Sequence, residues 1–194
     1  MFHLGSDEVR EFRENGKKVI KLVRVRNGEN PAAMWYKYKN PAIQGFNYFI
    51  GFLCKGLPPL EIKNSMYRLI GVKIGRNVAI APDCIIDPLF PELIRIDDNV
   101  IIGWGTRLYT HEFTQNTVRI GTVHIKKNSL VGEWSVVRPG VSINENALVA
   151  AMSFVNMDIP RGFVEGGVPV HVIGRSRTNA SAKRRKLRRR TRSR

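Results

Sequence analysis

The chain has 194 residues, of which 43% are hydrophobic, so it is long and apolar enough for one packed domain with small appendages. Cys54 and Cys84 are isolated in the sequence, which fits a reducing compartment and argues against a disulfide framework or a structural zinc site. The net charge of +16 is concentrated in residues 175–194, which hold eleven Lys or Arg; residues 1–174 have 21 basic and 16 acidic residues, or +5.

Residues 1–71 predict an N-terminal, partly helical region. Its charged stretch at 6–26 fits either a helix or a strand. The apolar and aromatic run 42–54 lies between proline breakers and predicts a helix. This helix either packs on the open end of the region that follows and caps it, or lies on a membrane surface with the basic C-terminal segment as a second anchor. Residues 61–71 predict a short helix that leads into the next region.

An aliphatic residue then recurs at every sixth position in three phased blocks. A period of six fits neither an α-helix nor simple strand alternation. It predicts a coil with three short flat sides, in which each aliphatic side chain points to the axis and stacks on its equivalent one coil later. We expect the small or turn-forming residue that often follows it to lie at the corner. The phased residues are Ile74, Ile80, Ile86, Ile96, Ile102, Leu108, Ile125, Val131, Val137, Ile143, Val149 and Val155.

The phase breaks twice, at PLFPELIR (88–95) and around THEFTQNTVR (110–119). We count the second gap, from Leu108 to Ile125, as two repeats plus five residues. Insertions in a solenoid leave the ladder as loops, and such loops often build the binding face. The second insertion contains His111.

Residues 66–174 resemble the hexapeptide-repeat acyltransferases, in particular the branch with the maltose, galactoside and nodulation-factor O-acetyltransferases. The motifs that carry the resemblance are IGRNVAIAPDCIID, IRIDDNVIIGWGTRLYTHEF and the closing GVPVHVIG, which is similar to the family's GxPAxxI. The resemblance implies a mainly β fold, a left-handed parallel β-helix over residues 72–174, assembled as a homotrimer. It also implies acyl transfer from an acyl-CoA, usually acetyl-CoA, to a hydroxyl or amine, with no metal required.

The family's catalytic histidine falls on His111. A neutral imidazole can take the proton of a hydroxyl as that hydroxyl attacks the thioester. The oxyanion that forms needs a hydrogen-bond donor, often a backbone N–H. Asp87 and Glu112 are candidates to orient either the acceptor or the imidazole. For both carboxylates, a turn role without part in the chemistry stays open.

The resemblance also implies a set of positions that contact CoA in a groove between subunits. Asn156-Met157 stands where Thr-Lys is common, and His171 stands where Lys or Arg is common, so fewer charges face the CoA phosphates. An arginine at 161, 175 or 177 could replace them. Ala81 stands in place of a sugar-contacting Asn, so a maltose-like or galactoside-like acceptor is not implied. The expected CoA-binding positions are Glu133, Ala151, Asn156, Met157, His171 and Arg175.

Three other functions compete with acyl transfer. A metal hydratase like the gamma carbonic anhydrases needs three histidines on zinc, and His111 and His124 lack a third in the expected loop. A β-helix scaffold without catalytic activity, held to a membrane or to nucleic acid by its basic tail, is the main alternative. Nucleic-acid binding as the main function would place recognition in the tail, since the globular part has no recognised motif.

The tail, residues 175–194, is expected to be a disordered, solvated arm that is attracted to anionic lipids or nucleic acid. No apolar run reaches the roughly 18 residues that a membrane-spanning helix needs. The first residues lack the pattern of a cleaved signal peptide. We therefore expect a cytoplasmic protein, with a peripheral membrane location left open. Sugars or cell-envelope glycans are the acceptors that the resemblance favours.

Overall fold

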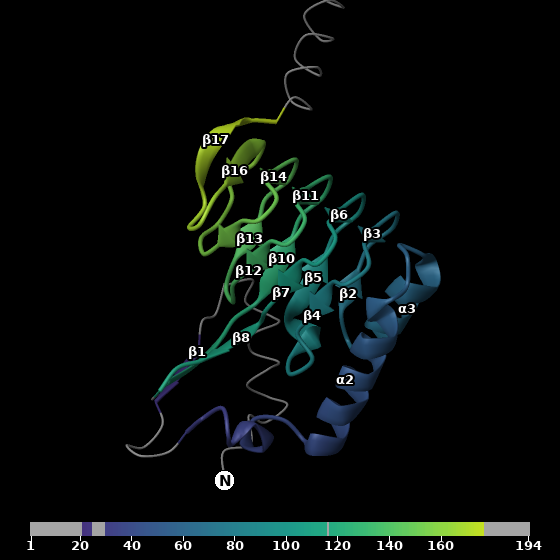
Figure 1. Cartoon of the computed structure of the whole chain (residues 1–194), viewed down its shortest axis with the longest axis vertical. Coiled ribbons are helices and arrows are strands. Elements are labelled where there is room, and N and C mark those ends of the chain that lie inside the picture. The colour runs from purple at the N-terminus through teal and green to yellow at the C-terminus, as the bar shows by residue number, and fades with distance from the viewer. Residues whose placement is uncertain (1–20, 25–29, 116, 177–194) are drawn as a thin grey trace, which may run out of the picture.

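The structure is a computed structural model that describes residues 21–24, 30–115 and 117–176. This part of the chain is mainly β, with two α-helices at one end of a long stack of short strands (Figure 1). The predicted tail lies outside the described residues from position 177 on. The helices and strands are β1 (Lys21–Arg24), the 3-10 helix η1 (Trp35–Lys37), α2 (Pro41–Lys55), α3 (Glu61–Leu69), β2 (Lys73–Ile74), β3 (Ala79–Ile80), β4 (Ile85–Ile86), η2 (Pro91–Leu93), β5 (Ile94–Ile96), β6 (Ile101–Ile102), β7 (Arg107–Leu108), β8 (His111–Phe113), β9 (Thr117–Ile120), β10 (Val123–Ile125), β11 (Leu130–Val131), β12 (Val136–Val137), β13 (Ser142–Ile143), β14 (Leu148–Val149), β15 (Phe154–Val155), β16 (Phe163–Gly166) and β17 (His171–Arg175).

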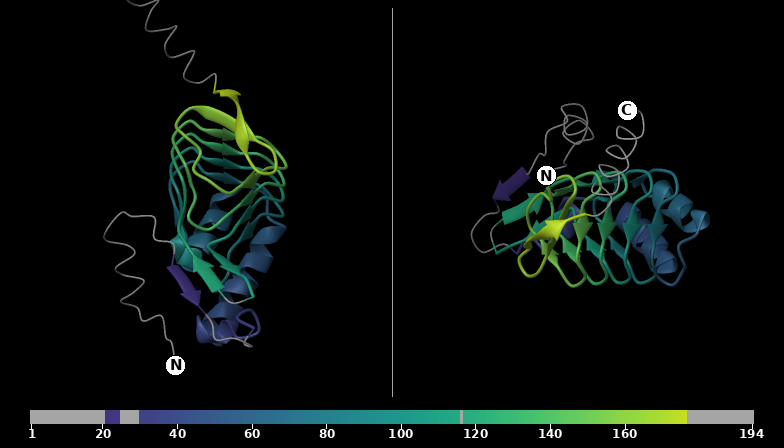
Figure 2. Two further views of the ribbon diagram at one scale, coloured as in Figure 1. Left: turned by 90° about the vertical axis from the view of Figure 1, so that its left-hand side faces the viewer. Right: turned by 90° about the horizontal axis from the view of Figure 1, so that it is seen from above.

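The six-residue repeat winds into a parallel β-helix with three sides, as predicted (Figure 2). Its three sheets contain the strands in the orders β13-β10-β5-β2, β14-β11-β6-β3 and β15-β12-β7-β4, and β16 and β17 extend the second sheet. The phased aliphatic residues pair in register: Ile80 with Ile102, Ile102 with Val131, and Val131 with Val149. Eleven of the twelve are buried, and each contributes about 1.5–3 kcal/mol. Ile74, in the first coil, is partly buried against this core.

The corners of the coil differ from the expectation. The left-handed backbone conformation falls on the third residue after nine of the twelve phased aliphatics, as at Asn128 (φ 59°) and Trp134 (φ 57°), and not beside the aliphatic residue. The small residue directly after the aliphatic serves another purpose: a Cβ on Gly132 would lie 2.4 Å from the backbone nitrogen of Ala151 in the next coil. Small residues there allow neighbouring coils to approach closely, and asparagine at many corners accepts the positive φ.

The two insertions build a second, smaller apolar cluster beside the coil. The first contains η2. The second forms the antiparallel hairpin β8–β9, and β1 pairs antiparallel with β9. Because Leu108 pairs with Val137 in the next coil and no side of the coil lies between Leu108 and Ile125, our count of two repeats plus five residues is wrong: the insertion adds eleven residues to one repeat. The core of the cluster contains Leu89, Phe90, Leu93, Val118 and Ile120.

Helix α2 covers the run predicted as helical and begins at Asn40, whose side chain accepts a hydrogen bond from the backbone of Ala42. Helix α3 lies against the first coil. Along the sides of the coil, N–H groups donate to the carbonyls of the following coil, so the carbonyls along the sides of the first coil face the open end. Side chains of α3 donate to four of them: Arg68 to Ile74 and Gly75, Asn64 to Val78, and Lys63 to Ala81. None of the helices among the described residues is long and apolar enough to cross a bilayer.

Candidate active site

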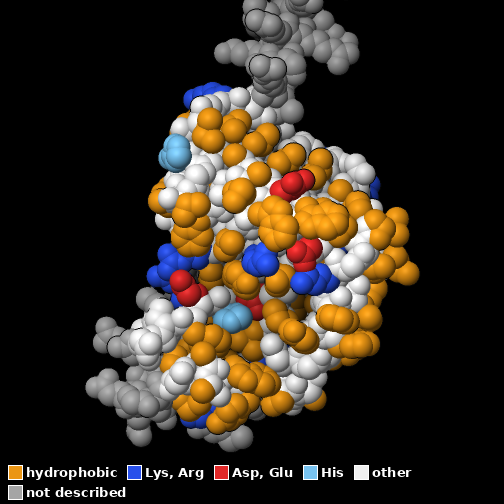
Figure 3. Space-filling model, viewed as in Figure 1, with side chains coloured by type: hydrophobic (Ala, Val, Ile, Leu, Met, Phe, Trp, Pro, Cys, Tyr) orange, Lys and Arg blue, Asp and Glu red, His pale blue; other side chains and the backbone are white. Residues whose placement is uncertain are grey.

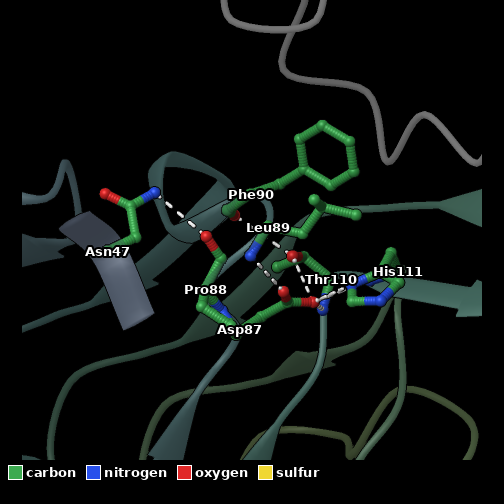
Figure 4. A network of polar contacts seen from close by, with 7 residues as sticks. All are labelled: Asn47, Asp87, Pro88, Leu89, Phe90, Thr110 and His111. Atoms are coloured by element: carbon green, nitrogen blue, oxygen red, sulfur yellow. Dashed lines mark hydrogen bonds and ion pairs between the residues drawn. The ribbon is translucent and has the colours of Figure 1, made fainter. Parts of the chain in front are cut away.

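A fully buried carboxylate, Asp87, lies at the end of β4, where the first insertion leaves the coil. Its Oδ1 accepts a hydrogen bond from the backbone N–H of Leu89 at 2.8 Å. Its Oδ2 accepts from the backbone N–H groups of Thr110 at 2.8 Å and His111 at 3.0 Å (Figure 4). Burial alone would raise the pKa of Asp87, but the hydrogen bonds and the neighbouring imidazole hold that pKa below its ordinary value. Asp87 is therefore ionised at neutral pH.

The imidazole of His111, in β8, lies against this carboxylate, with Nδ1 2.6 Å from Asp87 Oδ2. An ionised carboxylate only accepts hydrogen bonds, so the Nδ1 atom carries a proton and its N–H donates a hydrogen bond to Asp87 Oδ2. The lone pair of the neutral ring is then on Nε2. This atom has no hydrogen-bond partner within residues 21–24, 30–115 and 117–176, and the side chain is 18% exposed. The arrangement directs Nδ1 to the carboxylate and leaves Nε2 as the nitrogen that can accept a proton from a substrate.

Packing and backbone contacts hold the pair in place. The ring of Phe113 stands edge-on to the imidazole with 4.9 Å between centroids, and Phe90 does so at 6.3 Å. The Thr110 hydroxyl lies 2.9 Å from Asp87 Oδ2. On the other side of Asp87, the buried side-chain amide of Asn47 in α2 donates to the Pro88 carbonyl at 2.9 Å (Figure 4). Elements from three parts of the chain thus position one carboxylate and one imidazole.

Glu112, the other carboxylate considered, has different partners. Its Oε2 accepts hydrogen bonds from Arg138 Nε at 3.0 Å and Nη2 at 2.7 Å, and Arg119 Nε lies 3.8 Å away. Glu112 therefore makes an ion pair beside the site and has no hydrogen bond to the imidazole. The carboxylate that contacts His111 is Asp87.

The expected CoA-binding positions lie on two corners of the coil and on β17. Glu133 and Ala151 are exposed at equivalent corners of successive coils, between the second and third sides. Asn156 and the exposed Met157 follow β15 at the next corner. Asn156 is in the same column as Arg138 and Tyr109, so it lies two strands, or about 10 Å, from the base of the hairpin that carries His111.

His171 and Arg175 are the first and last residues of β17, and both are exposed. The guanidinium carbon of Arg175 lies 4.6 Å from the centre of the Phe163 ring in β16. Arg175 therefore belongs to a strand, whereas the sequence assigned it to the tail. Ala81 is partly buried and its carbonyl accepts a hydrogen bond from Lys63, which is fully buried.

The described part of the chain holds no group of three or more His, Cys, Asp or Glu side chains that could bind a metal ion. The two histidines considered for a metal site have separate partners. His124, in β10, lies with Nε2 2.9 Å from Asp97 Oδ2, on the first side of the coil. His111 is in the hairpin and contacts Asp87.

Sequence reasoning missed several neighbours of the pair. Thr110, Phe113 and Arg138 contact His111, Asp87 or Glu112, and Asn47 holds the segment after Asp87. Thr110 and Phe113 are close to His111 in the sequence, so they could have been predicted as its neighbours. Asn47 and Arg138 could not, because their approach depends on how the helix and the coils pack.

Comparison with known proteins defines the class. No family model matches the chain. YvoF of Bacillus subtilis (strain 168), assigned as an acetyltransferase, is 32% identical over 144 residues, which cover 73% of this chain and 84% of YvoF. A maltose O-acetyltransferase from Clostridium difficile 630 shares the fold with a TM-score of 0.54, 19% identity and coverage of 70% of this chain and 87% of that one.

A second solved structure with this fold is the hexapeptide-repeat acetyltransferase VCA0836 from Vibrio cholerae O1 biovar eltor, complexed with acetyl coenzyme A. Its TM-score to this chain is 0.52 with 20% identity, and the match covers 69% of this chain and 87% of that one. The fold shared with these structures is that of the left-handed β-helix acetyltransferases. The chain belongs to the hexapeptide-repeat acetyltransferase family, and it is an acyltransferase.

Proposed function

We propose that the chain transfers an acetyl group from acetyl-CoA to a hydroxyl of a sugar or cell-envelope glycan, with His111 as the general base and Asp87 as its positioning residue. The observation that carries the proposal is the 2.6 Å contact between Asp87 Oδ2 and His111 Nδ1, which leaves Nε2 free. Family membership supports the acetyl group, and the acetyl coenzyme A bound to VCA0836 supports the donor. The maltose O-acetyltransferase with the same fold supports a sugar hydroxyl as acceptor.

In the proposed reaction, Nε2 of His111 takes the proton of the acceptor hydroxyl while the oxygen attacks the thioester carbonyl. The imidazolium that forms is stabilised by the ionised Asp87 at its other nitrogen. The tetrahedral intermediate then collapses, the carbon–sulfur bond breaks, and the imidazolium returns the proton to the CoA sulfur. The products are an acetyl ester and free CoA. The base is thus ready for the next turnover.

The proposed enzyme is a homotrimer. Support comes from exposed apolar side chains on the outer surface of the coil, such as Ile101, Trp104, Trp134 and Met152, each of which is at least 47% exposed. A contiguous exposed apolar surface favours association. The proposed location is the cytoplasm. Glu133, Ala151, Asn156, Met157, His171 and Arg175 are the proposed contacts of the donor.

We also propose that α3 caps the open end of the coil, a role that was expected of the helix at residues 42–54. An unpaired edge of a sheet is a template for association with another chain. The hydrogen bonds from Lys63, Asn64 and Arg68 to carbonyls of the first coil support this role, since they satisfy groups that no preceding coil can pair.

Two measurements test the proposed function. Acetyl-CoA should raise the melting temperature of the protein, because a ligand that binds only the folded state stabilises it. A screen of sugars and glycan fragments should then identify acceptors that release free thiol from acetyl-CoA. Absence of both stabilisation and thiol release would contradict the proposal and favour a β-helix without catalytic activity.

A further inference from the structure

Helix α2 exposes most of its large apolar side chains and buries one asparagine. The side chains that it buries against the rest of the protein are Asn47, Ile50 and Cys54, and Gln44 is partly buried beside them. Surface helices ordinarily turn their apolar face inward and their polar face to water. The large apolar side chains on the outer face of α2 are Phe46, Tyr48, Phe49, Phe52 and Leu53, which are 42% to 67% exposed.

These five side chains lie on one side of the helix, which we call the α2 outer face. Apolar side chains gather over α2 at the lower right of the molecule (Figure 3). Exposed apolar patches of this kind mark sites where a protein meets a partner or a membrane. Aromatic residues supply most of the face. Tyrosine is suited to the boundary between water and lipid because its ring is apolar and its hydroxyl can stay in water, and phenylalanine is common on the apolar face of helices that lie at this boundary.

The positive charge of the sequence favours an anionic surface over a second protein. From residue 30 to residue 60 the chain has three lysines, Lys37, Lys39 and Lys55, and no Asp or Glu. Lys39 and Lys55 make ion pairs with Glu92 and Asp83, at 2.8 and 3.0 Å, so these two contribute little net charge. The larger excess of positive charge is in the sequence from Arg175 on, with eleven Lys or Arg.

That basic segment is long enough to reach the same surface. The described chain ends at Ser176, at the end of the coil opposite α2 (Figure 1). The four strand steps from β3 to β16 span about 20 Å. The 18 residues that follow Ser176 can span up to about 60 Å when extended. One flat surface along the coil can therefore contact both the α2 outer face and the basic segment.

We propose that the α2 outer face docks on the surface of an anionic lipid bilayer. At 15 residues, α2 is about 22 Å long and lies in the plane of the interface, with its aromatic side chains in the headgroup region. The opposite face of the same helix holds the active-site segment, because Asn47 donates to the carbonyl of Pro88, the residue after Asp87. Docking thus leaves about one helix diameter, roughly 10 Å, between the lipid and the face of α2 that contacts Pro88. The proposal stands independently of the reaction.

Flotation of the full chain with lipid vesicles tests the proposal. Two vesicle types are compared, phosphatidylcholine alone and phosphatidylcholine with about one third phosphatidylglycerol. The variant carries Phe49→Ser and Phe52→Ser, two side chains that are 56% and 67% exposed and so contribute little to the fold. The matched control is Val172→Ser in β17, which is 58% exposed and lies at the other end of the coil. Melting temperature and molecular mass are measured for each protein.

The native chain and the Val172→Ser control should float with the anionic vesicles. The double variant should show a partition coefficient lower by about tenfold or more, with unchanged melting temperature and mass. Undiminished flotation of the double variant would overturn the proposal and assign membrane binding to the basic segment alone. A fall in molecular mass of the double variant would overturn it too, since the face would then be a contact between copies of the chain.

Discussion

Replacement of Asp87 by asparagine tests the role of the buried carboxylate with almost no change in shape. The carboxylate accepts hydrogen bonds from three backbone N–H groups and from the imidazole of His111. An asparagine side chain has one acceptor oxygen. If that oxygen faces His111, the amide NH₂ faces the N–H of Leu89, and two donors oppose each other in a buried site. The alternative orientation places two donors against each other at the imidazole.

The magnitudes follow from these contacts. Hydrogen bonds to a charged group contribute about 1.5–3 kcal/mol each, and most are kept at reduced strength, so Asp87→Asn should lower the free energy of unfolding by about 2–4 kcal/mol. Without the carboxylate, the N–H at Nδ1 of His111 no longer donates a hydrogen bond to an anion, and the imidazolium that forms during the reaction loses the negative charge that stabilises it. The kcat for acetyl transfer should fall by about 100-fold to 10,000-fold, the usual contribution of a positioned base. The KM for acetyl-CoA should stay unchanged.

The assay is thiol release from acetyl-CoA with an acceptor identified by the screen, measured from acid to neutral pH, alongside urea denaturation. Thr110→Val is the matched control, because it removes one hydroxyl that lies 2.9 Å from Asp87 Oδ2 and leaves the imidazole contact in place. This control should lose about 1 kcal/mol of stability and keep kcat within a few-fold. If Asp87→Asn lowers stability and retains native kcat, Asp87 supports the fold alone and the reasoning about the base is refuted.

Three further outcomes follow from the fold. Ile102→Ala should cost about 2–5 kcal/mol of unfolding free energy, because Ile102 is in the core and 1% exposed. Its neighbour Ile101 is 49% exposed, so Ile101→Ala should cost less than about 1 kcal/mol, and urea denaturation compares the two variants. Arg68→Ala should cost about 1–3 kcal/mol by the same measurement, because it leaves the carbonyls of Ile74 and Gly75 without their side-chain donor. The pKa of Asp87 lies below its ordinary value in the folded state, so the stabilising effect of the carboxylate is complete above about pH 4 and is lost as the pH falls through the lowered pKa. In urea denaturation at decreasing pH, the native protein should therefore lose more unfolding free energy than the Asp87→Asn variant.

The stacked core could be predicted from the sequence because every phased position has to be aliphatic. Ile102 and Val131 occupy equivalent positions that only the six-residue period reveals, and they pair in the structure. The backbone conformation at the corners was harder to predict from the sequence. Trp134 and Met152 both adopt a positive φ of 57°, although neither residue type favours that conformation, and their place in the coil imposes it.

The hairpin and its partner strand could not be predicted, because β1 meets β9 about 100 residues later in the chain and no period marks either strand. At the site, the sequence singled out His111 but left Asp87 and Glu112 equivalent, since both are carboxylates next to predicted turns. Three-dimensional contacts separate them. Asp87 is buried against the imidazole, and Glu112 is paired with Arg138.

Acetyl transfer by a His111→Ala variant tests the central claim most directly. The side chain is at the edge of the hairpin and 18% exposed, so the variant should fold, with acetyl-CoA raising its melting temperature as in the native chain. We predict that thiol release in the presence of acceptor falls by about 100-fold to 10,000-fold. A folded variant that acetylates the acceptor at the native rate would show that the imidazole beside Asp87 is not the base.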